Sequence, residues 1–236
     1  MDSIQIILIT LILGLVSVVG IYYIQNFELK STKKPTFLII GNNYSGKTTW
    51  FMKLQGKKKP TISSIEANYG EIRLPLSQDS IAKPFQIVDY PGYLKYDNLF
   101  KNLIEDINLK GVCFVIDSEL NNFNKNLNLI AIKLFKILTI TETYPNGKDF
   151  LFMVNKSDLF NSLPVNKIRT LLEAEMNKVI ESELKNNEDE LSFWHDLLPF
   201  KFEKLNGNMD FKSGSVLKGK TQDWENWLDE IVVNPQ

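Results

Sequence analysis

The sequence predicts a doubly wound, mostly parallel α/β sheet that is preceded by one N-terminal transmembrane helix. Short apolar runs typical of buried strands alternate with segments that have helical periodicity. A glycine-containing loop separates the first of these runs from the first helical segment. Ahead of both lies a long apolar stretch that carries no charge. Together these patterns indicate one globular domain behind a membrane anchor.

The N-terminal stretch has the length and polarity of a membrane-spanning helix. Of the 21 residues from 4 to 24, 16 are apolar and none is charged. A helix of that length extends about 31 Å, which matches a hydrocarbon core of about 30 Å. A cleaved signal peptide is the alternative, but it needs a basic start, and Asp2 is the only residue before the run with a charged side chain. We therefore expect residues 1–25 to form an anchor that contacts the lipid bilayer through residues 4–24.

A basic tether follows the predicted anchor at residues 26–35. Lys30, Lys33 and Lys34 lie in it, whereas the flank before the anchor has no lysine or arginine. The positive-inside rule then places the rest of the chain in the cytosol. Residues 36–236 form the predicted globular domain.

Composition excludes several classes of protein. The chain has 236 residues and a net charge of −1, without the basic bias that is usual for a nucleic-acid-binding protein. Its single cysteine, Cys113, excludes an internal disulfide framework and a zinc site with several cysteines. Its single histidine, His195, excludes a multi-histidine metal site and argues against a Ser/His/Asp triad. We interpret His195 as a bystander.

The elements of the globular domain follow one another along the chain. Apolar and β-branched runs predict strands at residues 36–40, 69–76, 84–89, 111–117 and 150–154. Helical spacing predicts helices that cover residues 126–143, 163–185 and 224–231, and a further helix is expected to start near Lys47, after the interruption at residues 41–46. An asparagine-rich stretch at 119–128 and a charge-rich stretch at 181–190 are interpreted as solvated loops or helix ends.

The loop after the first strand matches the phosphate-binding pattern G-x-x-x-x-G-K-[ST]. It consists of Gly41, Asn42, Asn43, Tyr44, Ser45, Gly46, Lys47 and Thr48, and Thr49 follows it. Glycines let the backbone wrap phosphates, and backbone N–H groups at a helix N-terminus face the negative charge. We expect Lys47 to reach the β- and γ-phosphates and Thr48 to bind Mg²⁺.

A second pattern, D-x-x-G, follows the predicted strand 84–89. Asp89 would hold Mg²⁺ through water, and the N–H of Gly92 would meet the γ-phosphate. Between the two patterns we expect a hydroxyl that senses both Mg²⁺ and the γ-phosphate. Thr61 is the first candidate and Ser64 is the second, and the sequence leaves this choice open.

A third pattern predicts which base is bound. Asn155, Lys156, Ser157 and Asp158 match N-K-x-D directly after a buried strand. A carboxylate at Asp158 would accept hydrogen bonds from both N1–H and the amino group of guanine, a pair that adenine does not offer. A wrong base would leave the buried charge without a partner, at a cost of roughly 2–5 kcal/mol. Ser213, in the small polar run 213–215, is the candidate for the loop that backs the base.

An N-terminal anchor, a short basic tether and these three patterns in this order resemble the beta subunits of the signal recognition particle receptor, an Arf-like branch of the small GTPases. The likeness rests on residues 41–49, 60–61, 88–92, 155–158 and the Trp224-x-x-Trp227-Leu228 helix. It implies a P-loop GTPase-like fold and GTP with Mg²⁺ as ligands. It also implies a single-pass protein of the endoplasmic reticulum membrane that recruits the N-terminal domain of the receptor alpha subunit for protein targeting.

One position predicts slow GTP hydrolysis. Many small GTPases have a glutamine after the D-x-x-G glycine, where it orients the attacking water. This chain has Tyr93, which also departs from the histidine usual in the receptor family, and a protonated phenol orients water poorly. Arg73 is the nearest arginine that could act as a finger.

Two other classes of protein fit these patterns less well. A membrane-anchored P-loop ATPase or kinase would show no guanine preference, against the pattern at 155–158. An Arf- or Rab-like trafficking GTPase is usually attached by lipid, but this chain has neither a Met-Gly start nor a C-terminal CaaX box.

Overall fold

The computed structural model describes residues 5, 14–18, 34–57, 66–74, 84–92, 101, 103–104, 107–185 and 192–233. The chain divides into two compact units, residues 1–34 and residues 35–236. In the first unit, the described residues 5 and 14–18 are helical. The rest of the predicted anchor and most of the predicted tether lie outside the described residues. In the part of the chain that is described, no helix is long and apolar enough to cross a membrane.

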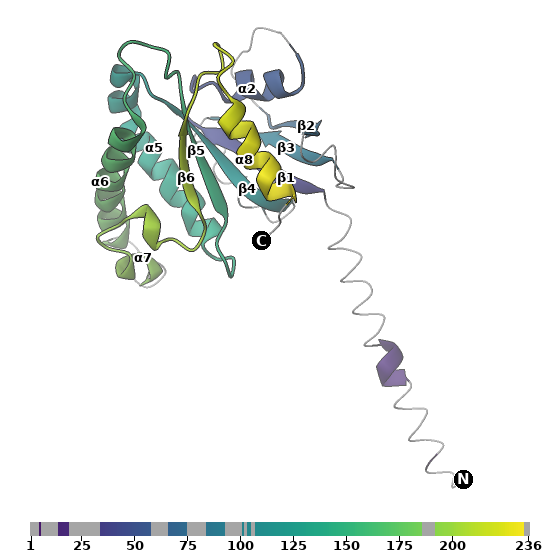
Figure 1. Cartoon of the computed structure of the whole chain (residues 1–236). Coiled ribbons are helices and arrows are strands. Elements are labelled where there is room, and N and C mark those ends of the chain that lie inside the picture. The colour runs from purple at the N-terminus through teal and green to yellow at the C-terminus, as the bar shows by residue number, and fades with distance from the viewer. Residues whose placement is uncertain are drawn as a thin grey trace. The chain divides into compact units, whose positions relative to one another are not determined.

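The second unit is built on a six-stranded sheet with the order β2-β3-β1-β4-β5-β6 (Figure 1). Its strands are β1 (Pro35–Gly41), β2 (Asn68–Ile72), β3 (Phe85–Asp89), β4 (Asn108–Asp117), β5 (Asp149–Asn155) and β6 (Met209–Ser213). All neighbouring pairs are parallel except β2 and β3, which are antiparallel. The order runs outward in both directions from β1 and β4, so the prediction of a doubly wound, mostly parallel sheet is confirmed.

Among the described residues, four longer helices cover the sheet. They are α2 (Lys47–Leu54), α5 (Leu120–Thr141), α6 (Val165–Leu184) and α8 (Gln222–Val233), and the short α7 (Ser192–Asp196) and η2 (Phe202–Lys204) lie between α6 and β6. Periodicity predicted α5, α6 and α8, whereas α2 was expected from the loop that precedes it. His195 is exposed on α7, which lies at the opposite end of the sheet from α2 (Figure 1).

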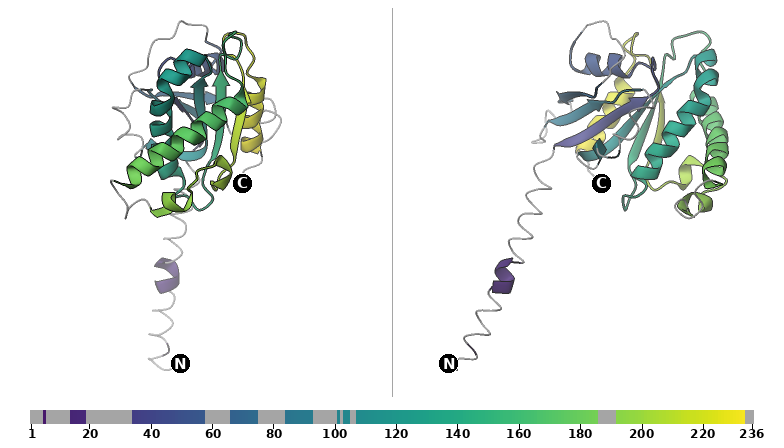
Figure 2. Two further views of the ribbon diagram at one scale, coloured as in Figure 1. Left: turned by 90° about the vertical axis from the view of Figure 1, so that its left-hand side faces the viewer. Right: turned by 180° about the vertical axis from the view of Figure 1, so that it is seen from behind.

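Alternation along the strands creates two separate cores. Leu38 and Ile40 of β1 belong to the core beneath α5 and α6, whereas Phe37 and Ile39 of the same strand belong to the core beneath α2 and α8. Figure 2 shows α5 and α6 on one face of the sheet and α8 on the other. Parallel strands are buried on both faces and therefore consist of continuous apolar runs. Such runs are easily recognised in a sequence, so most of these strands were predicted correctly.

Three elements differ from the sequence prediction. Strand β2 ends at Ile72, four residues before the predicted end, and Arg73 and Leu74 lie outside it. Helix α5 begins at Leu120, six residues before the predicted start, because both carboxylate oxygens of Glu119 accept hydrogen bonds from backbone N–H groups, at 3.1 Å from Asn121 and 2.7 Å from Asn122. The asparagine-rich stretch is therefore mostly the first turns of this helix. Strand β6 was not predicted, since its sequence, MDFKS, has no continuous apolar run and it lies at the edge of the sheet.

Candidate nucleotide-binding site

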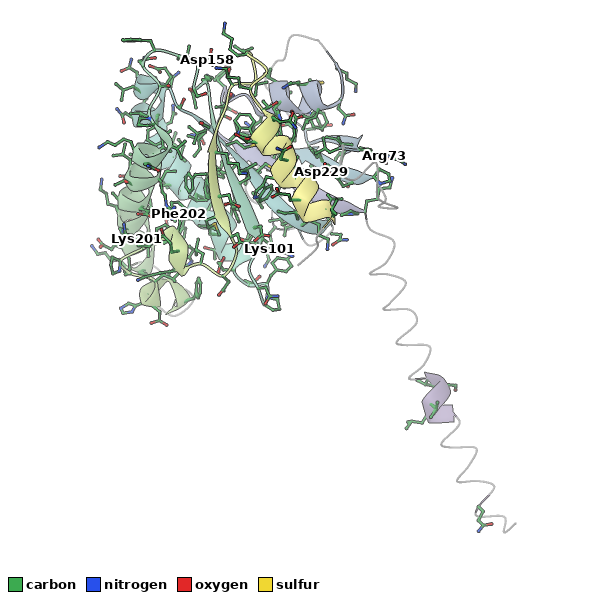
Figure 3. The ribbon with its side chains drawn as sticks, viewed as in Figure 1. Arg73, Lys101, Asp158, Lys201, Phe202 and Asp229 are labelled. Atoms are coloured by element: carbon green, nitrogen blue, oxygen red, sulfur yellow. The ribbon has the colours of Figure 1, made fainter. Side chains whose placement is uncertain are left out.

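All the predicted sequence patterns that the structure describes lie at one edge of the sheet. Parallel strands end together at their carboxyl termini, and the loops that follow β1, β3, β5 and β6 carry the residues of interest. The strand register pairs Ile39 with Asp89, Asp117 with Asn155, and Val154 with Ser213. This edge also holds Asp158, which is labelled in Figure 3.

The phosphate loop has the backbone shape that its glycines were expected to allow. Gly41 and Gly46 have φ values of 139° and 101°, which side chains rarely adopt. A Cβ at Gly41 would collide with the carbonyl of Val115, and a Cβ at Gly46 with the amide of Asn155. Tyr44 also adopts a positive φ, 62°, and its side chain is exposed. The loop thus passes so close to β4 and β5 that only glycine fits at these two positions.

Lys47 lies inside the phosphate loop as a buried cation. Its side chain is only 6% exposed, and its Nζ donates to the backbone carbonyl of Asn42 at 2.8 Å. Burial lowers the pKa of Lys47 to about 8, the charge of Asp89 opposes that shift, and the charge of Lys133 adds to it. A cation held at such a cost is stabilised by any anion that enters the loop.

Thr48 and Asp89 are joined directly. The Thr48 hydroxyl donates to Asp89 Oδ2 at 2.8 Å, and Asn68 Nδ2 donates to the same oxygen at 3.0 Å. A hydroxyl and a carboxylate are hard oxygen donors of the kind that Mg²⁺ takes together with phosphate oxygens and water. Among the described residues no group of three or more His, Cys, Asp or Glu side chains could hold a metal ion. The donor set therefore fits Mg²⁺ that is brought in with a phosphate ligand.

Asn155 connects the phosphate loop to the loop after β6. Its side chain is buried, its Nδ2 donates to the carbonyl of Ser45 at 2.7 Å, and its Oδ1 accepts from the N–H of Val216 at 3.1 Å. One carboxamide thus sets the spacing between the phosphate loop and the two loops expected to surround the base.

Lys156 and Asp158 take different positions after β5. Lys156 has a φ of 65°, and its Nζ forms an ion pair with Asp117 Oδ2 at 2.6 Å. Asp158 is exposed, and a hydrogen bond from Ser215 is the main cause that lowers its pKa, helped by the charges of Lys218 and Lys220. The Asp158 carboxylate is therefore stabilised in the ionised form that a guanine-reading group requires.

The loop after β6 involves Ser215 more closely than the predicted Ser213. Ser213 is the exposed last residue of β6 and pairs with Val154, whereas Ser215 is buried and is the residue that bonds Asp158. The carbonyl of Gly214 accepts from both the N–H and the hydroxyl of Ser157, at 3.1 and 2.8 Å. Ser213 thus takes no part in the contact with Asp158, and Ser215, the last residue of the predicted run, makes it.

The remaining predicted residues either lie outside the described part of the chain or lie away from the contacts above. Thr61, Ser64 and Tyr93 lie outside the described residues. Thr49 lies in the first turn of α2 and is partly buried. Arg73 follows β2, at the end of that strand remote from Asn68 and therefore about 17 Å along it from the level of Asp89. Figure 3 shows Arg73 and Asp158 on well separated parts of the domain, which does not support Arg73 as a finger.

Sequence analysis did not find two charged residues that lie at this site, Asp117 and Lys133. Asp117 pairs with Lys156, and its position as the last residue of a buried strand was the available signal. Lys133, on α5, has no local pattern to mark it.

A cavity of about 650 Å³ opens between the phosphate loop, the end of β4 and α5, lined in part by Asn42, Tyr44, Gly92 and Asp117. Its volume is in the range of small-molecule sites.

The fold and this arrangement of loops define the class of small GTPases. The structure resembles the mammalian signal recognition particle receptor with a TM-score of 0.69 and 23% identity, covering 83% of this chain and 99% of that one. It resembles the Chaetomium thermophilum SRb-GTP/SRX complex with a TM-score of 0.67 and 20% identity, covering 84% and 99%. The Arl6 BBS3 small GTPase of Trypanosoma brucei gives a TM-score of 0.59 at 18% identity, covering 85% and 98%.

Sequence comparison then shows the family. The family described as signal recognition particle receptor beta subunit matches residues 32–211. The signal recognition particle receptor subunit beta of Saccharomyces cerevisiae is 34% identical over 215 residues, which are 84% of each chain. The corresponding Dictyostelium discoideum protein is 26% identical over 188 residues, 75% of this chain and 62% of that one. This chain belongs to the family of signal recognition particle receptor beta subunits, as the resemblance predicted.

The buried Lys47 predicts a pH dependence of stability in nucleotide-free protein. Burial holds its pKa at about 8, below the ordinary lysine value of 10.5, so the unfolded chain binds more protons between these values. Stability therefore rises with pH across this window. Lys47→Met lacks this titration, so its free energy of unfolding relative to wild type should fall by about 2 kcal/mol from pH 8 to pH 10.

Urea unfolding of both proteins in EDTA, at several pH values, measures this difference. Lys57→Met, at an exposed position beyond the same helix, controls for removal of a lysine. A constant difference between wild type and Lys47→Met over this pH range would show that Lys47 is not held at a desolvation cost.

Proposed function

We propose that this protein is a GTP-binding, membrane-anchored subunit of the signal recognition particle receptor. In its GTP-bound state it would recruit the N-terminal domain of the alpha subunit at the endoplasmic reticulum membrane for co-translational protein targeting. Residues 4–24 would cross the membrane once, with the GTP-binding domain in the cytosol. Family membership and the nucleotide-bound states named for the Chaetomium thermophilum relatives, SRb-GTP and SRb-GDP-Mg, support this proposal.

The single observation that carries the proposal is the bridge made by Asn155 between the phosphate loop and the 213–216 loop. The bridge ties the phosphate loop to the loop expected to back the base, an arrangement that a site for phosphate alone does not need. Here the bridge holds the anion-binding backbone, the Asp158 carboxylate and Ser215 in one rigid group. Such a group suits a ligand with phosphates at one end and a purine at the other.

Each residue at the edge of the sheet has a role in this proposal. Lys47 and the backbone of the phosphate loop would bind the β- and γ-phosphates. Thr48 and Asp89 would hold Mg²⁺, which neutralises phosphate charge when it is bound, and Thr61 or Ser64 would join them in the GTP state. Gly92 would meet the γ-phosphate, while Asp158, backed by Ser215, would pair with guanine and Lys156 would flank it.

Slow intrinsic hydrolysis completes the proposal, because Tyr93 replaces a water-orienting glutamine and Arg73 lies away from the site. GTP would then act mainly to order the segments that contact the partner. Single-turnover hydrolysis measured without a partner should be slow. A rate comparable to that of a GTPase stimulated by its activating protein would remove this part of the proposal.

Base recognition is tested by Asp158→Asn. An amide in place of the carboxylate cannot accept two hydrogen bonds from guanine but can pair with the 2-oxo group of xanthine. We expect GTP affinity to fall at least tenfold and XTP affinity to rise, with ATP weak throughout. Competition titrations with labelled GTP measure all three ligands.

Asp223→Asn, at an exposed position in the first turn of α8, is the matched control for charge removal. Unaltered GTP selectivity in Asp158→Asn would show that another group reads the base. Equal affinity of the wild type for ATP and GTP would favour the ATPase class instead.

Recruitment is tested by capture of the alpha-subunit N-terminal domain on the full chain in liposomes. Wild type loaded with a non-hydrolysable GTP analogue should retain the partner, and wild type loaded with GDP should not. Lys47→Ala should lose nucleotide and partner together, because it removes the cation inside the phosphate loop. Partner retention by nucleotide-free Lys47→Ala would contradict a GTP-dependent switch.

A further inference from the structure

Lys133 is a buried cation that the roles assigned above do not use. It lies in the middle of α5, and its side chain is only 5% exposed. Its Nζ donates a hydrogen bond to the backbone carbonyl of Gly92 at 2.6 Å. The two residues are 41 positions apart in the sequence, so only the tertiary fold brings them together.

The surroundings of Lys133 strengthen this contact. Ile40, Tyr90, Pro91 and Ile137 line, together with Lys133 and Lys136, a small and mostly apolar cavity of about 30 Å³ between α5 and the carboxyl ends of β1 and β3. A hydrogen bond from a charged donor is stronger in such apolar surroundings than in water, and a buried charge that loses its acceptor is costly. The Lys133–Gly92 bond is therefore a firm constraint on the backbone where the D-x-x-G pattern ends.

Gly92 lies between two lysines. Its carbonyl faces Lys133, whereas a Cβ built on its Cα would lie 2.9 Å from Lys47 Nζ and 2.8 Å from the backbone N of Asn43. Gly92 thus presents its Cα to the phosphate loop while α5 holds its carbonyl from behind. The charge of Lys133 also lies near enough to Lys47 to lower the pKa of the latter.

From this geometry we propose that Lys133 is a positioning residue for the terminal phosphate of the bound nucleotide. By holding the Gly92 carbonyl on α5, it keeps the Gly92 backbone against the phosphate loop, where its N–H meets a γ-phosphate. Its positive charge adds to that of Lys47 at the same place. Both effects favour a nucleoside triphosphate over the diphosphate, which has no group there. The inference rests on the proposed function, because it assumes a guanine nucleotide in this site.

The test compares the affinities of the full chain, in mild detergent, for GDP and for a non-hydrolysable GTP analogue. Lys133→Met removes the donor and the charge at nearly constant volume. We expect the ratio of GTP-analogue to GDP affinity to fall roughly tenfold, the effect of losing one hydrogen bond to a charged group. A purely structural role for Lys133 would weaken both ligands together and leave the ratio unchanged.

Lys136→Met is the matched control, since Lys136 lies one turn along the same helix and is exposed. Its affinity ratio should equal that of the wild type, and a tenfold fall there too would overturn the inference by revealing a general charge effect. If Lys133→Met does not fold, Lys133→Gln is measured in its place and should also lower the ratio.

The outcomes separate this inference from the proposed function. A wild-type ratio in the folded Lys133 variant overturns the inference and leaves guanine-nucleotide binding intact. A wild type that takes up neither nucleotide, with magnesium supplied, overturns the proposed function and the inference together.

Discussion

The candidate nucleotide-binding site depends on the two hydrogen bonds made by the buried carboxamide of Asn155. Its nitrogen bonds the phosphate loop at Ser45 and its oxygen bonds the loop after β6 at Val216. Both loops follow parallel strands, which end at the same edge of the sheet, but strand order alone does not set the distance between them. A buried amide that satisfies both of its polar ends sets this distance, because losing either bond would leave an unpaired polar group inside the protein.

Electrostatics explains why the ligand should be an anion. Lys47 and Lys133 are both buried near the phosphate loop, and Asp89 is the buried carboxylate beside them. Among the described residues, the buried charges beside this loop are two cations and one carboxylate, and burial makes the Lys47 charge costly. The lowered pKa of Lys47 expresses that cost, and a bound phosphate would offset it. The same arrangement fits Mg²⁺ at Thr48 and Asp89 only together with a phosphate ligand, since these two residues alone provide few oxygens.

Sequence analysis located the strands and the patterned loops well, because buried parallel strands are continuous apolar runs and the phosphate loop follows one directly. It placed the start of α5 too late, since asparagines are weak helix formers and the cap from Glu119 is not a common one. It missed β6, an edge strand with little apolar character. It named Ser213, where the fold brings Ser215 to the Asp158 carboxylate.

Local patterns were sufficient to identify the family, the phosphate loop, and Asp158 as the candidate base reader, because each depends on a short run of residues with its own chemistry. They were also sufficient to propose the anchor from the length and polarity of residues 4–24. Contacts such as Lys156 with Asp117 and Lys133 with Gly92 join residues 39 and 41 positions apart. No local spacing predicts them, because they exist only once the sheet and α5 have packed together.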